Sequence, residues 1–355
     1  MKKISNILKC FTIIITSIFT TCYCKISTDA YAIGSSYALV EKISGRVLYA
    51  QNESIKLPMA STTKILTAIT VINNFDIDKT VTVPKECEGV EGSSVYLKCG
   101  DKFTVIDLLY GLMLRSGNDC AETLAITLSG SISEFANLMN KTAKECGALN
   151  SNFVNPHGLH DDNHYTTALD LANITRHALL NQTFREIVGS KSYSTKEQAS
   201  GESRYWVNKN KMLASYEGAT GVKTGYTKKA GRCLVSSAIR NGMEVICVVL
   251  NEPNHYERSK KLLNDAFKDF KLVKLVDCSK FNYRLPNEDK TRYYDLKINE
   301  DFYYPIKNDE KITAEIELPN CLDGNVKNGQ MVGKIKIYTS KQLIFFENIY
   351  TLIRN

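Results

Sequence analysis

The sequence predicts an α/β fold in which a larger domain of helices and strands, residues 33–272, precedes a small all-β domain, residues 278–355. Two observations support this division. Segments with helical and with strand periodicity are mixed as far as Phe270, whereas only short alternating stretches follow Cys278, such as residues 312–318 and 331–338. A chain of 355 residues is also long enough for more than one domain.

The N-terminus has the pattern of a secretory signal peptide. Lys2, Lys3 and Lys9 precede an apolar run, residues 10–19, that is too short to cross a bilayer. We therefore predict that residues 1–24 are a signal peptide and that the protein acts outside the cytoplasmic membrane. Cleavage near residues 22–24 fits the spacing, cleavage at residues 30–32 fits the small-residue rule, and lipidation of Cys22 is a third option.

The net charge favours no strongly charged partner. The formal charge of the whole chain is +7, and removal of residues 1–24, with three lysines and no acidic residue, leaves +4. This charge permits a loose association with an anionic cell wall or membrane surface. It is too small to indicate nucleic-acid binding, and we predict none.

The cysteines are not spaced like a disulfide framework or a zinc site. Three of the eleven lie in residues 1–24, and the other eight are scattered without a Cys-x-x-Cys pair. Cys120, Cys233 and Cys247 lie in apolar patterns, so we predict that they are buried. Cys87 and Cys99 are the one pair that we consider for a disulfide.

The first elements are a hairpin and a buried helix. Strand-like alternation in residues 37–40 and 46–49, on either side of Ser44-Gly45, predicts the hairpin. The helix that follows has apolar residues at helical spacing, at Ile65, Leu66 and Ile69, and we expect it at the middle of the fold. Residues 80–84 form a short predicted strand.

Several helix starts carry capping signals. Thr104 and Asp107 form a predicted capping box, and the helix that they open runs through Leu114. A turn at residues 114–119 leads into a second helix from Ala121. Residues 131–134 cap a helix that closes near Gly147, and residues 167–170 cap another. The loop between them, residues 152–164, contains His and Asp but lacks metal-ligand spacing, so we predict no metal.

The last part of the larger domain is a hairpin followed by a helix. Residues 233–238 and 244–250 are strongly apolar, and Asn241-Gly242 between them is a typical hairpin turn. Residues 259–270 form the predicted helix. The end of the chain, residues 343–350, is more typical of a strand than of an amphipathic anchor helix.

The first chemical motif is Ser61-x-x-Lys64 at the start of the buried helix. This spacing puts the two side chains on one face, one turn apart. The free N–H groups of the first turn favour the negative charge that develops on an attacking serine. A lysine can act as the base if burial or another cation lowers its pKa. The alternative is an ordinary helix start with an exposed lysine.

Two further motifs follow. Ser116 and Asn118 lie on the turn between two helices, although Gly117 could simply form this turn and Asn118 or Asp119 could cap the next helix. The sequence Lys223-Thr224-Gly225 lies on a predicted strand beside the last hairpin. It offers a cation, a hydroxyl and an uncovered backbone to a ligand along the sheet edge.

In this order and these contexts, the three motifs are those of β-lactamases and penicillin-binding proteins. Residues 32–270 resemble the low-molecular-mass penicillin-binding proteins that are serine-type D-alanyl-D-alanine carboxypeptidases. Residues 108–111, 115–119, 155–159 and 230–235 carry this resemblance as well. The tail resembles the C-terminal β domain of the family. The resemblance implies a β-lactamase/transpeptidase-like domain, an antiparallel sheet flanked by helices.

The resemblance implies an acyl-enzyme reaction without a cofactor. Ser61 would attack the carbonyl between the last two D-alanines of a peptidoglycan stem peptide, and Lys64 would take its proton. Ser116 would pass a proton to the leaving amine, and water would hydrolyse the acyl-enzyme. The family is inhibited covalently by β-lactam antibiotics and acts in cell-wall biogenesis.

The remaining implied roles concern binding. Asn118 would hold the substrate amide, and Lys223 with Thr224 would bind the terminal carboxylate. Gly225 belongs to the same binding strand. The N–H groups of Ser61 and Tyr226 would form the oxyanion hole.

Two departures from the family pattern affect the binding of the carboxylate and the attachment to the membrane. An arginine that usually helps to bind the carboxylate corresponds in register to His255, with Arg258 one turn later. The family commonly ends in a membrane-binding amphipathic helix, and we expect no such helix in the strand-like residues 343–350.

Two alternative functions remain. A class A β-lactamase would carry a glutamate in the loop before Thr167, and residues 152–167 contain none. A non-catalytic muropeptide- or β-lactam-binding protein would be expected to lack Ser61 or Lys64.

Overall fold

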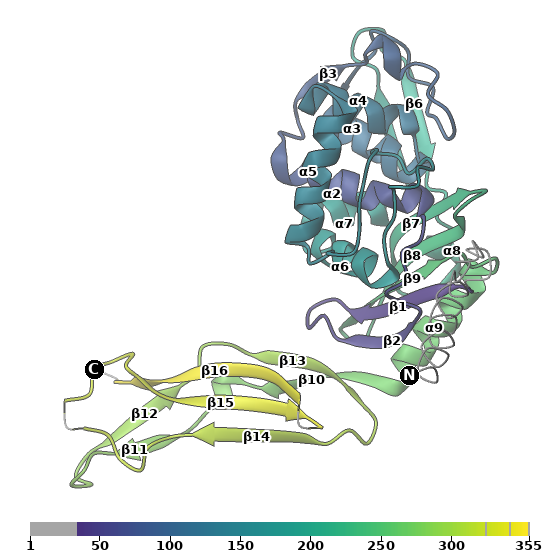
Figure 1. The fold of residues 1–355 in the computed structure, drawn as a ribbon. Coiled ribbons are helices and arrows are strands. Elements are labelled where there is room, and N and C mark those ends of the chain that lie inside the picture. The colour runs from purple at the N-terminus through teal and green to yellow at the C-terminus, as the bar shows by residue number, and fades with distance from the viewer. Residues whose placement is uncertain (1–33, 324, 341, 354–355) are drawn as a thin grey trace, which may run out of the picture. The chain divides into compact units, whose positions relative to one another are not determined.

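The computed structural model describes residues 34–323, 325–340 and 342–353. The predicted signal peptide and both candidate cleavage positions lie outside these residues. The predicted α/β fold is confirmed. A five-stranded antiparallel sheet with the order β2-β1-β9-β8-β7 forms its centre (Figure 1), from β1 (Ser36–Glu41), β2 (Val47–Gln51), β7 (Ala219–Thr227), β8 (Gly231–Arg240) and β9 (Met243–Leu250).

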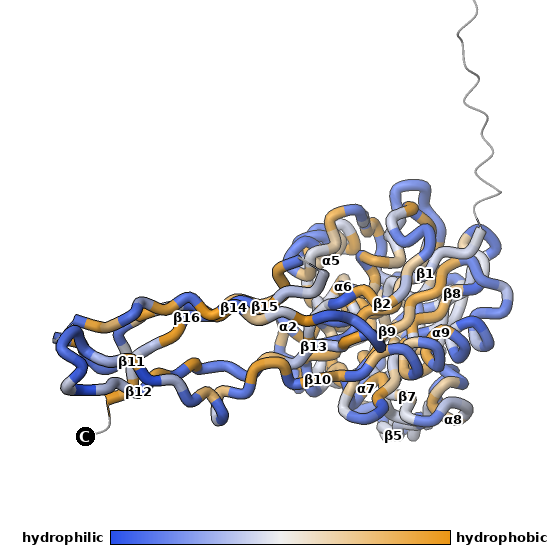
Figure 2. Tube along the Cα trace, turned by 90° about the horizontal axis from the view of Figure 1, so that it is seen from below, coloured by the Kyte–Doolittle hydropathy of each residue, from blue (hydrophilic) through white to orange (hydrophobic). Residues whose placement is uncertain are grey.

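The sheet is covered by helices on both faces. Every residue of β9 is buried, and Figure 2 shows this strand as hydrophobic. Alternate residues, among them Leu39 and Cys247, form one core with Leu262 and Leu263 of α9 (His255–Asp269). Because strand side chains alternate between faces, the buried residues between them point toward α6 (Ala168–Ala178), which also contacts β1 and β9.

The helical part is built around α2 (Lys64–Asn74). Its residues from Lys64 to Val71 are buried, and it contacts α6 and three further helices, α4 (Asn118–Ser129), α5 (Ile132–Glu145) and α7 (Gln182–Gly189). This confirms the prediction of a buried central helix. Further helical segments of the described residues are α3 (Val105–Tyr110), α8 (Met212–Ser215) and the short segments η1 (Ala60–Thr63), η2 (Lys85–Cys87), η3 (Gly111–Arg115) and η4 (Cys278–Lys280).

The predicted capping residues form their hydrogen bonds. The Thr104 hydroxyl accepts from Asp107 N, and the Asp107 carboxylate accepts from Thr104 N at 3.1 Å, which completes the capping box of α3. Ser131 and Thr167 cap α5 and α6 in the same way. The predicted hairpin turn is also present, since Asn241 and Gly242 both have positive φ, 49° and 79°.

Two small sheets lie outside the central one. Strand β3 (Thr80–Thr82) pairs with β4 (Lys102–Thr104), and β5 (Ser192–Lys196) pairs with β6 (Ser203–Val207). The second hairpin was not predicted, because only Trp206 of its strand residues is buried and the hydrophobic alternation is weak.

The C-terminal part is all β, as predicted. Strand β10 (Phe270–Val276) pairs with β13 (Phe302–Lys307). A sheet of order β11-β12-β16-β15-β14 follows, from β11 (Arg284–Pro286), β12 (Tyr293–Lys297), β14 (Ile312–Glu317), β15 (Met331–Thr339) and β16 (Gln342–Leu352). It has its own core around Leu296, Ile335, Ile337 and Ile349. The boundary expected at residue 272 falls inside β10 and stays a prediction.

The predicted burial of three cysteines is confirmed, whereas the disulfide that we considered is absent from the described residues. Cys120, Cys233 and Cys247 are fully buried, as expected. The disulfide considered between Cys87 and Cys99 is not formed, because Cys87 is buried under α4 whereas Cys99 is exposed. Among the described residues, none of the helices has the length and apolar character needed to span a membrane.

Candidate active site

Ser61 and Lys64 are in contact at the entry to the central helix. The Lys64 Nζ lies 3.1 Å from the Ser61 Oγ. Ser61 is in the 3-10 turn η1 rather than in the first α-helical turn, because the hydroxyls of Thr62 and Thr63 bind the carbonyls of Met59 and Ala60. The turn brings the serine to the end of α2 and leaves it partly exposed, while Lys64 is completely buried.

The surroundings of Lys64 favour an uncharged amine. Its Nζ donates to Asn118 Oδ1 at 2.6 Å and to the His157 carbonyl at 2.7 Å. Both acceptors, like the Ser61 hydroxyl, are neutral groups. Burial first, and the charge of Lys223 second, hold the pKa of Lys64 well below that of an ordinary lysine. A neutral amine beside a serine hydroxyl can accept its proton.

Ser116 ends a π-helical segment, η3 (Gly111–Arg115), in a left-handed conformation. Its φ is 65°, whereas Gly117 has φ −60°. The simple explanation, in which Gly117 forms the turn, is therefore wrong. A non-glycine residue in this region carries strain of about 1–3 kcal/mol, which is commonly found at functional sites. Ser116 is only 6% exposed and lines the same pocket as Ser61.

Asn118 and Asp119 do not cap α4, which has Gly117 at its N-cap without a side-chain hydrogen bond. Asn118 instead connects Lys64 to the Glu91 carbonyl, to which its amide donates at 2.6 Å. The fully buried Asp119 accepts from Val95 N, Leu97 N and the Ser94 hydroxyl. It thereby holds the loop before β4, a function that sequence reasoning missed because an aspartate at a helix start is typically a cap.

The Lys223-Thr224-Gly225-Tyr226 segment lies on the edge strand β7, as predicted. Thr224, Gly225 and Tyr226 line the pocket with Ser61 and Ser116. A Cβ at Gly225 would lie 3.1 Å from Ser61 N and 3.0 Å from Met59 O, so the close approach of the strand to Ser61 requires glycine. Lys223 is 2% exposed, and its Nζ donates to the Thr224 carbonyl at 3.1 Å.

The charge of Lys223 is also modified by burial. Burial first, and Lys209 second, lower the pKa of Lys223 to about 7. Lys64 and Lys223 therefore form a pair of buried amines in which each positive charge would disfavour the other. Together with burial, this pairing explains how the site can keep Lys64 neutral without a high pH.

The pocket has a volume of about 350 Å³ and a basic rim that sequence reasoning missed. Lys209, Lys211 and Arg232 line it together with His255. None of the three lies in a local motif with Ser61 or Ser116, so no spacing indicated them. Of the two residues considered for the carboxylate, only His255 lines the pocket. The Arg258 guanidinium lies over the Tyr37 ring, 4.9 Å from its centroid.

The loop at residues 155–159 supports Lys64 from behind. The Asn155 Oδ1 accepts from Gly158 N at 2.7 Å, and the His157 Nε2 lies 3.2 Å from a Glu122 carboxylate oxygen. Gly158 has φ +89°, and a Cβ there would lie 1.9 Å from the Ala60 carbonyl. The loop therefore packs directly on the turn that carries Ser61. No cluster of potential metal ligands occurs in the part of the chain that the structure describes.

His164 also supports the turn that carries Ser61, and its burial leads us to predict that stability depends on pH. Its Nε2 contacts the Thr63 hydroxyl at 2.8 Å, and its Nδ1 accepts from Val154 N at 3.1 Å. Burial first, and His157 second, lower the pKa of His164 to about 3. An unfolded histidine has a pKa near 6.5, so the stabilisation by neutral His164 is complete above that pH and is lost as the pH falls toward 3.

We expect this histidine to contribute about 3 kcal/mol to the loss of stability between pH 7 and pH 4. The free energy of unfolding, measured with urea at pH 7 and pH 4, should fall more steeply in the wild type than in His164→Asn, which keeps an acceptor without titrating. Equal slopes in the two proteins would contradict the role of His164.

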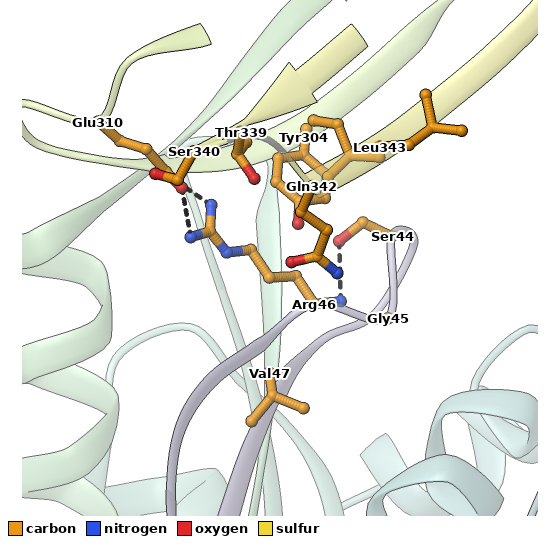
Figure 3. A pocket seen from close by; sticks show the side chains of 11 residues that line it. Ser44, Gly45, Arg46, Val47, Tyr304, Glu310, Thr339, Ser340, Gln342 and Leu343 are labelled. Atoms are coloured by element: carbon orange, nitrogen blue, oxygen red, sulfur yellow. Dashed lines mark hydrogen bonds and ion pairs between the residues drawn. The ribbon is translucent and has the colours of Figure 1, made fainter. Parts of the chain in front are cut away.

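A larger cavity than this pocket lies elsewhere. It has a volume of about 640 Å³ and is lined by Arg46, Tyr304, Glu310 and neighbouring residues (Figure 3). Arg46 donates two hydrogen bonds to Glu310, at 2.7 and 2.8 Å, and its guanidinium lies 5.0 Å from the centroid of the Tyr304 ring. These groups satisfy one another and include no nucleophile with a base, so we place the chemistry at the smaller pocket.

Comparisons with known proteins agree with the geometry. Residues 25–254 match the family described as D-alanyl-D-alanine carboxypeptidase, and residues 281–353 match the C-terminal domain of penicillin-binding protein 5. The D-alanyl-D-alanine carboxypeptidase DacF of Bacillus subtilis is 31% identical over 313 residues, 84% of this chain and 80% of the relative. DacA of Haemophilus influenzae is 32% identical over 87% of this chain and 81% of the relative.

Solved structures show the same likeness. Penicillin-binding protein 5 of Haemophilus influenzae superimposes with a TM-score of 0.75 and 28% identity, over 89% of this chain and 96% of that one. The Streptomyces K15 DD-transpeptidase gives a TM-score of 0.63 and 35% identity, over 65% of this chain and 96% of that one. This chain belongs to the D-alanyl-D-alanine carboxypeptidase family, the serine peptidases that act through an acyl-enzyme.

Proposed function

We propose that this protein removes the terminal D-alanine from peptidoglycan stem peptides through an acyl-enzyme on Ser61. The observation that carries the proposal is the 3.1 Å contact between the Ser61 hydroxyl and the fully buried amine of Lys64. In the first step, Lys64 takes the hydroxyl proton while Ser61 Oγ attacks the carbonyl between the two D-alanines. The carbonyl becomes a tetrahedral oxyanion bonded to Oγ.

The oxyanion is stabilised by the backbone N–H groups of Ser61 and Tyr226. The close approach of Gly225 to Ser61 N supports this arrangement, because it puts the edge strand beside the nucleophile. Each such donor typically contributes about 3–4 kcal/mol to the transition state. The site therefore requires β7 to keep its position against η1.

The leaving group departs with a proton that Ser116 relays from Lys64. When the C–N bond breaks, this proton goes to the amine nitrogen, D-alanine is released and the peptide stays esterified to Ser61. Asn118 orients Lys64 and binds the substrate amide; its NH₂ has two hydrogens, and one is donated to the Glu91 carbonyl. Thr224 and Lys223 stabilise the substrate carboxylate. Water then hydrolyses the ester.

The location and partners follow from this chemistry. The substrate lies outside the cytoplasmic membrane, so residues 1–24 act as a signal peptide and the mature chain works at the cell surface. It has a catalytic domain near residues 33–272 and a β domain at residues 278–355. β-Lactams acylate Ser61 because they imitate the D-Ala-D-Ala terminus. No cofactor or nucleic acid takes part, and the net charge of +4 provides a loose association with the wall or membrane.

The direct test is the release of D-alanine. The purified protein, incubated with a peptide that ends in D-Ala-D-Ala, is expected to release free D-alanine over many turnovers, and none from the same peptide ending in L-Ala-L-Ala. D-Amino-acid oxidase coupled to peroxide detection measures the product. Failure to release D-alanine, or rapid hydrolysis of penicillin in its place, would contradict the proposal and favour the binding-protein or β-lactamase alternative.

A further inference from the structure

The pocket that contains Ser61 is basic beyond Thr224. Four of its lining residues carry basic groups, namely Lys209, Lys211, Arg232 and His255. Within the described chain, its lining includes no Asp or Glu. A substrate that ends in a carboxylate is attracted to such a surface. The sequence motifs assigned this carboxylate to Lys223 and Thr224, and Lys223 does not line the pocket.

Arg232 is placed to reach a carboxylate bound beside Thr224. It is directly opposite Tyr226 in the pairing of β8 with β7, and directly opposed residues project from the same face of a sheet. Its guanidinium lies 5.7 Å from the centroid of the Tyr226 ring, and Tyr226 is 63% exposed at the pocket. The aromatic ring therefore supports the guanidinium along the edge where the substrate lies.

The guanidinium of Arg232 is not committed to a carboxylate of the protein. Arg46, Arg185 and Arg284 each form an ion pair with an Asp or Glu at 2.7–2.8 Å. Arg232 forms none with any residue in the described ranges. A planar guanidinium offers two parallel N–H donors that match a carboxylate, and it stays charged at every physiological pH.

The other cations are less suited to a direct, paired contact with the carboxylate, although Lys223 can still stabilise it from behind Thr224. Lys223 is buried, and its amine is bound to the Thr224 carbonyl. Burial lowers the pKa of His255 below its ordinary value, so this imidazole is mostly neutral at pH 7. Arg258 lies over Tyr37, away from the pocket lining. Lys209 and Lys211 are exposed point charges without the geometry for a paired contact.

We propose that Arg232, reaching across from β8, binds the C-terminal carboxylate of the D-Ala-D-Ala substrate and makes the enzyme select a free acid. The inference rests on the proposed function and names the residue that determines its substrate class. Arg232, on strand β8, would replace the arginine that the family pattern has at the start of the last helix, where this chain has His255. Both arginines would bind the substrate carboxylate.

The test compares two peptides that differ only at the C-terminus, one ending in D-Ala-D-Ala and the other in its C-terminal amide. Both contain the same scissile bond, so release of D-alanine and of D-alaninamide reports the same chemistry. For Arg232→Gln, we expect kcat/KM for the acid to fall by about 10- to 100-fold, the usual value of a hydrogen-bonded charge contact. The loss should appear mainly as a higher KM for the acid, and kcat/KM for the amide should change little.

Three variants separate the roles of charge and geometry. Arg232→Lys keeps the charge and should retain part of the preference for the acid. Lys211→Gln removes an exposed charge from the same pocket and should lower kcat/KM by less than about fivefold. The double variant Arg232→Gln with His255→Arg should regain the preference for the free acid over the amide, since an arginine then reaches the pocket from α9.

The two failures are distinguishable. If the wild type cleaves the acid and Arg232→Gln keeps the full preference for it over the amide, the inference is wrong while the proposed function stands. If the wild type cleaves neither peptide, the proposed function fails and the inference fails with it.

Discussion

A labelled penicillin is expected to acylate the intact protein at Ser61 and to leave the Ser61→Ala variant unlabelled. The lactam carbonyl imitates the carbonyl between the two D-alanines, and its attack requires the one hydroxyl that lies 3.1 Å from the buried amine of Lys64. Loss of the nucleophile lowers the rate of a serine hydrolase on the order of 10⁶-fold, which no neighbouring hydroxyl replaces. The effect is therefore all or none at any practical incubation time.

Intact-protein mass spectrometry measures the adduct, and peptide mapping locates it. Ser203→Ala, in the exposed strand β6, is a matched serine-to-alanine control and should be labelled at the wild-type rate. Thermal unfolding of each variant reports whether its fold is intact. Labelling of Ser61→Ala at the wild-type level would remove Ser61 from the mechanism.

Local sequence signals were sufficient to predict most of the fold. The caps at Thr104, Ser131 and Thr167 and the Asn241-Gly242 turn depend on residues within four positions of one another, so they can be predicted without knowledge of the tertiary structure. The same applies to Ser61 and Lys64, whose contact is fixed by one helical turn. Their meeting with Ser116 and the β7 strand followed from the resemblance and not from the periodicity.

The features that were missed depend on packing between distant segments. Asp119 resembles a cap in the sequence, and only the fold brings the loop at residues 93–97 onto its carboxylate. Arg232 and Lys209 reach the pocket from different segments, and neither has a spacing to Ser61 that sequence could use. The left-handed Ser116 is also a tertiary effect, because Gly117 is the better local candidate for such a turn.

Lys64→Arg is expected to abolish acylation in a protein that still folds. The guanidinium supplies N–H donors for Asn118 Oδ1 and the His157 carbonyl, so the contacts that Lys64 makes to the loop at residues 155–159 have a replacement. It does not lose its proton at any working pH and cannot take one from Ser61. We expect the acylation rate constant to fall by about 10³-fold or more. A general base typically contributes about 10²–10⁴-fold, so a loss of this size is what removal of the base predicts.

The comparison with Lys64→Met separates the role of Lys64 as a base from its structural role as a hydrogen-bond donor. Methionine fills much of the same buried volume but removes both the amine and its three hydrogen bonds, so it should lose acylation and also stability, because Asn118 and the His157 carbonyl lose a buried donor. Single-turnover acylation by a labelled penicillin gives the rate constant, and urea unfolding gives the stability. If Lys64 served only to hold the loop, Lys64→Arg would acylate at nearly the normal rate while Lys64→Met would not. A folded, inactive Lys64→Arg protein is the result that a base requires, since the hydrogen-bond donors are then retained and the capacity to accept a proton is lost.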